Sequence, residues 1–212
     1  ALYELGLHNG VAPLGYRISI SNGSTVSVSA YLDSRRFYQI KAAESAMFED
    51  EYCAHLCGWK KYGDLVPQPL GRAVSERWDI FVTHGVPHKP LSFTHKNHGR
   101  SLDRLLNDLN HFFRVSRTDL APPLESISHE VFLDYLEEYF KNTSIASMAT
   151  KWIARGRLLG FTRLPQIAQH GDFVLNNLAY SKEQLVIFDW EDYGKYQLPG
   201  LDICSFCFSV AP

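Results

Sequence analysis

The segment from His170 to Asp189 constrains the fold of this chain more than any other. It reads His-Gly-Asp-Phe-Val-Leu-Asn-Asn, and twelve residues after the second Asn another Asp closes an apolar run. Residues 178–180 and 184–188 favour β-strands on either side of a Ser-Lys-Glu turn, and this pattern predicts a β-hairpin. The hairpin would bring Asn177, before its first strand, next to Asp189, after its second.

These residue types at this spacing are what a phosphoryl-transfer site requires. One carboxylate, Asp172, would accept the proton of an attacking hydroxyl, while Asn177 and Asp189 would share a Mg²⁺ ion that bridges nucleotide phosphates. Each residue alone has an ordinary explanation as a loop or strand-end residue. Because all three occur together at the required spacing, the site interpretation is favoured.

The motifs HGDFVLNN and VIFDWEDYG resemble those of the aminoglycoside phosphotransferase/choline kinase family, small-molecule kinases with a protein-kinase-like fold. The resemblance implies an α+β, two-lobe fold, with a small antiparallel-sheet N-terminal lobe and a mostly helical C-terminal lobe. It implies ATP and Mg²⁺ as cofactors, and it makes His170 a scaffold residue rather than a proton carrier. His-Gly-Asp in place of the His-Arg-Asp of protein kinases favours a small-molecule acceptor.

The first ninety residues predict a small sheet with one helix. Residues 16–21, 25–32 and 37–42 read as three strands, the first two joined by an Asn-Gly-Ser turn. Residues 47–59 have helical spacing, and two more strands follow at 71–74 and 78–83. The apolar face of the helix is expected to comprise Phe48, Tyr52, Leu56 and Trp59.

Within this order, the resemblance implies that Lys41 on the third strand binds the α and β phosphates and that a Glu on the helix orients it. Alignment with the family's helix favours Glu49, and Glu51, on the opposite edge of the apolar face, is the alternative. Gly-x-Gly-x-x-Gly is absent, so the first hairpin, with Ser24, is a reduced candidate for the phosphate loop.

The resemblance divides the chain into a nucleotide-binding lobe (1–83), a linker (84–92) and a helical lobe (93–212). The backbone from Thr83 to Val86 would pair with adenine, and the histidines at 84, 88, 95 and 98 read as surface residues rather than a metal cluster. Helical patterns cover 102–113, 130–140 and 145–159. Asp202 would brace the catalytic loop, with a plain helix N-cap as the alternative.

Composition and charge bear on the partners of the protein, its location and the role of its cysteines. The 212 residues are 45% hydrophobic with a formal net charge of −2, which argues against a nucleic-acid-coating surface. The sequence shows neither a membrane-spanning apolar run nor a signal peptide, so we expect a cytoplasmic protein. Two close cysteine pairs (53/57 and 204/207) lie among apolar residues, which favours small buried thiols over zinc.

The sequence therefore predicts an ATP-dependent kinase that phosphorylates a hydroxyl of a small molecule, such as choline, ethanolamine, an aminoglycoside or a sugar. The alternative is a catalytically inactive, kinase-like nucleotide-binding or interaction domain. A Ser-His-Asp hydrolase is weakly supported, because Gly-x-Ser-x-Gly is absent. The chain stops in an apolar segment shortly after Asp202, so we expect a fragment that lacks part of the acceptor pocket. Acceptor identity and oligomeric state stay open.

Overall fold

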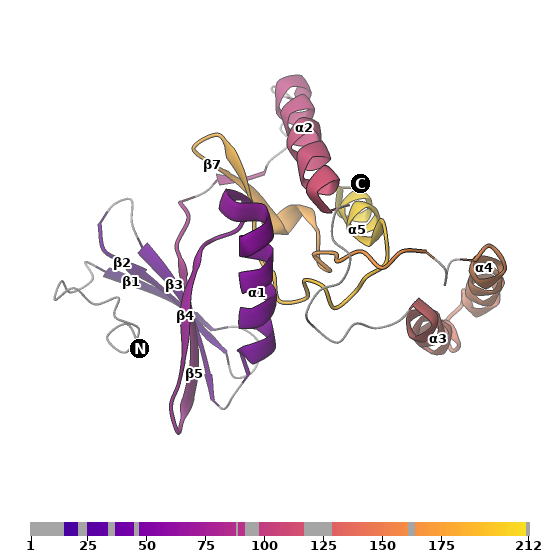
Figure 1. The fold of residues 1–212 in the computed structure, drawn as a ribbon, viewed down its shortest axis with the longest axis horizontal. Helices are drawn as coiled ribbons and strands as arrows, with labels where there is room; N and C mark the ends of the chain where they lie inside the picture. The colour runs from indigo at the N-terminus through magenta and orange to yellow at the C-terminus, as the bar shows by residue number, and fades with distance from the viewer. Residues whose placement is uncertain are drawn as a thin grey trace.

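The computed structural model describes residues 15–20, 25–33, 37–44, 47–87, 89–91, 98–116, 129–160 and 164–210. A five-stranded antiparallel sheet with one helix against it forms one side of the molecule (Figure 1). Among the residues described, a short three-stranded sheet and four further α-helices form the other side. The predicted order of three strands, a helix and two strands is confirmed.

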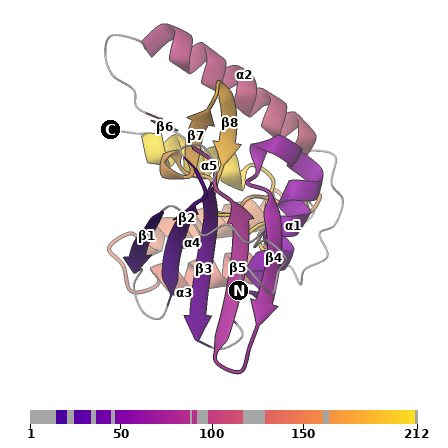
Figure 2. The ribbon, with the colours of Figure 1, turned by 90° about the vertical axis from the view of Figure 1, so that its left-hand side faces the viewer.

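The strands of the large sheet are β1 (Gly15–Ile20), β2 (Val26–Tyr31), β3 (Phe37–Glu44), β4 (Pro69–Val74) and β5 (Trp78–His84). They lie side by side in the order β1-β2-β3-β5-β4 (Figure 2). β3 is therefore central, and its Lys41 pairs with Ser27 of β2 and Phe81 of β5. This register places Lys41 in the middle of the sheet.

Helix α1 (Glu49–Tyr62) is held at both ends by buried hydrogen bonds. At its start, the carboxylate of Asp79, a fully buried residue on β5, accepts from the Phe48 amide and from the guanidinium of Arg72. Burial alone would raise the pKa of Asp79, but these hydrogen bonds lower it below its usual value. At its end, the Tyr62 hydroxyl lies 2.9 Å from the Ser116 hydroxyl.

The buried face of α1 matches the predicted one only in part, since Phe48, just before the helix, is buried as predicted. Ala54, His55, Gly58 and Tyr62 are buried, whereas Tyr52, Leu56 and Trp59 are only partly covered. The small residues decide this, because Trp190 from the other side of the molecule packs directly on Gly58. A Cβ atom added to Gly58 would lie 2.4 Å from the indole. A tertiary contact therefore selects the small side of the helix.

The other side of the molecule comprises β6 (Lys89–Pro90), α2 (His98–Ser116), α3 (His129–Phe140), α4 (Ala146–Leu158), β7 (Leu178–Ser181), β8 (Gln184–Ile187) and α5 (Leu201–Val210). β6 pairs with β7, and β7 with β8. Helices α3 and α4 lie farthest from the large sheet (Figure 1).

One core cluster joins α1, α2 and the hairpin. Its members include Leu105, Leu109, Phe112, Phe173, Leu178, Leu185, Ile187 and Trp190. Phe112 stacks on Phe173 with ring centroids 4.8 Å apart. This cluster fixes the loop between Phe173 and Leu178, which carries the sequence motif.

The cysteines are free thiols, and Cys204 and Cys207 are exposed on α5 while Cys53 and Cys57 are partly buried. The prediction of buried thiols is therefore wrong for the second pair, because α5 buries Asp202 and turns these two outward. In the described part of the chain, no helix is both long and apolar enough to cross a membrane.

Candidate active site

The loop that begins at His170 is fastened from behind by Asp202. The Asp202 carboxylate, at the start of α5, accepts hydrogen bonds from the backbone amides of His170 (2.7 Å) and Gly171 (3.0 Å). Burial raises the pKa of Asp202 to about 6. Gly171 has a φ of 93° and approaches Asp192 so closely that an added Cβ would lie 2.7 Å from it. The loop conformation therefore needs glycine here.

His170 is a fully buried scaffold residue in this structure. Its Nε2 lies 2.9 Å from the carbonyl oxygen of Phe188, and because a carbonyl only accepts, Nε2 carries the proton. Burial lowers the pKa of His170 to about 4, so the ring is neutral near pH 7. The ring thus ties the loop to the strand that ends before Asp189.

Asp172 and Asn177 lie at opposite ends of the loop and are hydrogen-bonded to each other. The Asn177 carboxamide Nδ2 donates to the carboxylate and to the carbonyl oxygen of Asp172, both at 2.9 Å. Asp172 is exposed. Asn177 therefore orients a carboxylate that is open to an incoming ligand.

The predicted hairpin forms, and it brings Asn177 close to Asp189. β7 and β8 pair from Leu178 opposite Ile187, and the Phe188 amide donates to the Asn177 carbonyl at 2.8 Å. Asp189 follows with a φ of 62°, the left-handed conformation that non-glycine residues adopt at a cost. This turn directs the chain after β8 toward Lys41, whose Nζ lies 3.6 Å from an Asp189 carboxylate oxygen.

Lys41 pairs with Glu51, not with Glu49. The Lys41 ammonium is 2.5 Å from the Glu51 carboxylate, whereas Glu49 reaches Arg72 at 3.5 Å and is 71% exposed. The preference for Glu49 was therefore wrong. Helix geometry explains this, since residues two apart point to nearly opposite sides of a helix, and Glu51 shares the buried face with His55, one turn later.

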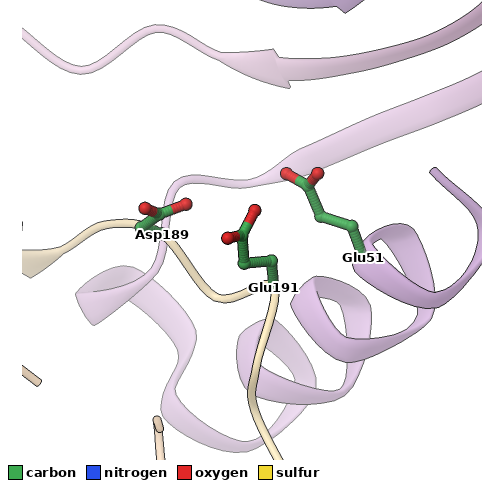
Figure 3. Close-up of side chains that lie close together, drawn as sticks. All are labelled: Glu51, Asp189 and Glu191. Carbon is green, nitrogen blue, oxygen red and sulfur yellow. The ribbon is translucent and has the colours of Figure 1, made fainter. Parts of the chain in front are cut away.

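Three carboxylates surround this ammonium group. Those of Glu51, Asp189 and Glu191 come within 4.8 Å of one another from two separate elements (Figure 3). Burial acts to lower the pKa of Lys41, but these carboxylates raise it above its usual value, so the amine stays charged. Burial and then the charge of Asp189 raise the pKa of Glu191.

This donor set fits a divalent cation. Three carboxylates and one ammonium leave two uncompensated negative charges, and Asn177 lines the same cavity as Glu51 and Asp189. Carboxylate and amide oxygens are the ligands that Mg²⁺ and similar hard cations take. The oxygen donors around Asp189 therefore match the ligand preference of a hard divalent cation.

Two cavities adjoin the site. One, of about 280 Å³, is lined by Lys41, Glu51, Thr83, Asn177 and Asp189, among others. The second, of about 440 Å³, is lined by Val131, Tyr135, Gly171, Asp172, Asp192, Tyr196 and Leu201. Asp172 and Lys41 thus line different cavities.

The other residues singled out from the sequence line cavities, lie outside the described residues or are exposed. Thr83 is buried and lines the cavity of Lys41, while Val86 lines a separate hollow of about 490 Å³. Ser24, His88 and His95 lie outside the described residues. His84 is exposed at the end of β5, and its ring lies 5.8 Å from that of Tyr38.

Sequence reasoning assigned no role to Glu191 or His55. Glu191 follows Asp189 by two positions, in the Trp-Glu pair that the motif contains, and this spacing was the available signal. His55 follows Glu51 by one helical turn, but that signal needs the correct Glu first. Both omissions follow from side-chain directions that spacing alone leaves open.

Comparison with known proteins now identifies the class. A profile of the phosphotransferase enzyme family (APH) matches residues 8–210, nearly the whole chain, so this protein belongs to that family. A comparison with curated protein sequences finds no significant match.

Solved structures show the same α+β, protein-kinase-like two-lobe fold. Spectinomycin phosphotransferase APH(9)-Ia, crystallised with ADP and spectinomycin, is 13% identical with a TM-score of 0.59, over 92% of this chain and 69% of that one. A choline/ethanolamine kinase family protein from Mesorhizobium loti is 15% identical (TM-score 0.62), over 92% of this chain and 64% of that one. Aminoglycoside-3'-phosphotransferase of type VIII is 17% identical (TM-score 0.59), over 98% of this chain and 82% of that one.

Proposed function

We propose that this protein transfers the γ-phosphoryl group of ATP to a hydroxyl group of a small molecule. The observation that carries the proposal is the meeting of Lys41 and Glu51, from the sheet side, with Asp189, from the motif segment. A buried structural ion pair would need one carboxylate for one ammonium. Three carboxylates around Lys41 leave a surplus negative charge that a bound divalent cation would neutralise, and such a cation accompanies the phosphates in phosphoryl transfer.

In this proposal the nucleotide occupies the cavity beside Lys41. The Lys41 ammonium binds the α and β phosphates while Glu51 holds it in place, and the backbone from Thr83 to Val86 pairs with adenine. Ser24 is a candidate phosphate contact. Asn177 and Asp189 hold Mg²⁺, with Glu191 beside them. When bound, this ion supplies charge neutralisation for the β and γ phosphates.

Asp172 is the proposed catalytic base. It accepts the proton of the acceptor hydroxyl as the hydroxyl oxygen forms a bond to the γ-phosphorus, and the bond from that phosphorus to the β,γ-bridging oxygen breaks to release ADP. The hydrogen bond from Asn177 keeps the carboxylate in its orientation. Catalysis rests on positioning and charge neutralisation, without a covalent enzyme intermediate.

The acceptor would bind in the cavity next to Asp172. Its charged lining residues in the described part of the chain are Asp172 and Asp192, and because Asp192 pairs with Lys195 at 2.9 Å, the net negative charge comes from Asp172; its walls include Tyr135 and Tyr196. A carboxylate-lined aromatic cavity favours a neutral or positively charged acceptor over an anionic one. Amino alcohols, aminoglycosides and neutral sugars all satisfy this condition.

The test is ATP consumption across a panel of these acceptors, with Asp172→Asn as the isosteric variant. We expect Asp172→Asn to lower kcat by about 10²- to 10⁴-fold, the usual contribution of a general base. Asn176, an exposed residue of the same loop that directly precedes Asn177, offers a control. Asn176→Ala should keep turnover near wild type. Unchanged turnover in Asp172→Asn would refute the mechanism.

The alternative, a catalytically inactive nucleotide-binding domain, predicts ATP binding without phosphorylation. Mg²⁺-ATP would raise the melting temperature of the wild type, because a ligand that binds only the folded state stabilises it. No acceptor on the panel would then be phosphorylated.

A further inference from the structure

His55 is a buried, ionisable side chain that the proposed reaction does not use. It lies on α1 one turn after Glu51 and is 6% exposed. Its Nε2 is 2.6 Å from the carbonyl oxygen of Pro67, and because a carbonyl only accepts, the imidazole donates this hydrogen bond. A buried donor with one short bond to rigid backbone has an orientation that is costly to change.

The same ring contacts the sheet directly behind Lys41. It packs edge-on against Phe81, with ring centroids 5.3 Å apart, and Phe81 is the β5 residue that pairs with Lys41 in the sheet. His55, Glu51 and Lys41 line one cavity, together with Pro67 and Phe81. The imidazole thus joins α1 to both the segment before β4 and the strand beside Lys41.

Two hydrogen-bonded anchors of α1 act at its ends, and Trp190 packs on Gly58 in its second half. Asp79 holds the Phe48 amide just before the helix, and Tyr62 contacts Ser116 at its last turn. Between them, the His55 hydrogen bond lies one turn from Glu51. This spacing matters because Lys41 has other carboxylates within reach, Asp189 at 3.6 Å and Glu191 at 3.9 Å. A small rotation of α1 would withdraw Glu51 and leave Lys41 to these two.

We propose that His55 is a positioning residue, whose hydrogen bond to Pro67 sets the rotation of α1 and so keeps Glu51 on Lys41. The inference rests on the proposed nucleotide-binding role of Lys41. Without the hydrogen bond, Lys41 would pair with the carboxylates proposed for the metal site. ATP binding would then weaken, because the phosphates lose a cation and the metal loses a ligand.

Two substitutions of His55 separate its hydrogen bond from its bulk. His55→Leu keeps an apolar side chain of similar size and removes the donor, whereas the amide nitrogen of His55→Gln extends to nearly the same place as Nε2. We expect His55→Leu to raise the KM for ATP by about tenfold, as loss of one buried hydrogen bond allows, with His55→Gln within about twofold of wild type.

Tyr62→Phe is the matched control, since it removes the buried hydrogen bond at the far end of the same helix. It should lower the melting temperature and leave the KM for ATP unchanged. His55→Leu should also have little additional effect in a Glu51→Gln background, because both changes act on one ion pair. A rise in KM in Tyr62→Phe equal to that in His55→Leu, or additive effects of His55→Leu and Glu51→Gln, would overturn the proposal.

Backbone amide hydrogen exchange provides a readout that does not depend on ATP. His55→Leu should speed exchange in the turn of α1 around Glu51 while the β3 and β5 amides stay protected, and His55→Gln should restore it. Unchanged exchange in His55→Leu would refute the positioning role. If instead the wild type binds no ATP, the proposed function fails, and this comparison still decides what His55 does.

Discussion

Among single side chains, Lys41 is the one on which most of the site converges. It touches Glu51 at 2.5 Å, with Asp189 and Glu191 farther away. Glu49, two residues before Glu51, is exposed and contacts Arg72 instead. The two glutamates have the same side chain and lie on the same helix, but their surroundings differ. Substituting each in turn therefore tests the ion pair with Lys41.

We predict that Glu51→Gln lowers kcat/KM for ATP about ten- to a hundredfold, whereas Glu49→Gln changes it less than twofold. The first removes a charged hydrogen bond that is worth about 1.5–3 kcal/mol, and the second removes a surface contact. Steady-state kinetics on both variants measures the difference. Equal losses in the two would show that helix charge, rather than the ion pair, matters.

Among the elements, α1 depends on a close approach to the segment after β8. Gly58 lets Trp190 pack against the helix, and the Trp190 indole is buried and donates to the Ile187 carbonyl at 2.8 Å. The indole is therefore held by α1 on one side and by its hydrogen bond to Ile187 on the other. This contact places α1 next to the residues on either side of Trp190, which are Asp189 and Glu191.

We predict that Gly58→Ala destabilises the protein, although alanine favours helices over glycine by about 1 kcal/mol. The added Cβ would lie 2.4 Å from a ring that cannot move away, and overpacking of this kind costs about 1–3 kcal/mol. Urea denaturation should show a net loss. Trp190→Phe in the same chain should recover part of it, and a gain in stability from Gly58→Ala alone would contradict the packing.

The strands and helices themselves follow closely from local patterns. The β7–β8 hairpin forms around the predicted turn, since β-forming runs flank Ser181-Lys182-Glu183, and Lys182 and Glu183 take the positive φ angles of such a turn. The face of α1 was not predictable in this way. The helix has apolar residues on one side and small residues on another, and periodicity alone does not say which side is buried. The contact of Gly58 with Trp190 decides it.

At the scale of the whole molecule, buried histidines make stability depend on pH. His55 and His170 are both buried, and burial lowers the pKa of each to about 4 from the usual 6.5. The unfolded chain therefore binds protons at a higher pH than the folded protein does. The stability that depends on these neutral histidines is fully present above about pH 6.5 and is lost as the pH falls toward 4.

We predict that wild type loses stability relative to His55→Gln by about 3 kcal/mol between pH 7 and pH 4, because glutamine does not titrate. Asp202, whose pKa is raised to about 6, acts in the opposite direction, but it is present in both proteins and cancels from the difference. Urea denaturation at several pH values measures it. A difference that stays constant with pH would show that His55 titrates normally.

Locally encoded features were determined by the sequence alone: the order of strands and helices, the hairpin, and the spacing of Asp172, Asn177 and Asp189. Neighbouring residues produce these features through turn chemistry and periodicity. The tertiary structure alone decided that Glu51 pairs with Lys41, that Glu191 joins them and that His55 lies behind them. The physical reason is that these choices depend on the rotation of α1, which is set by contacts with distant residues such as Trp190 and Pro67.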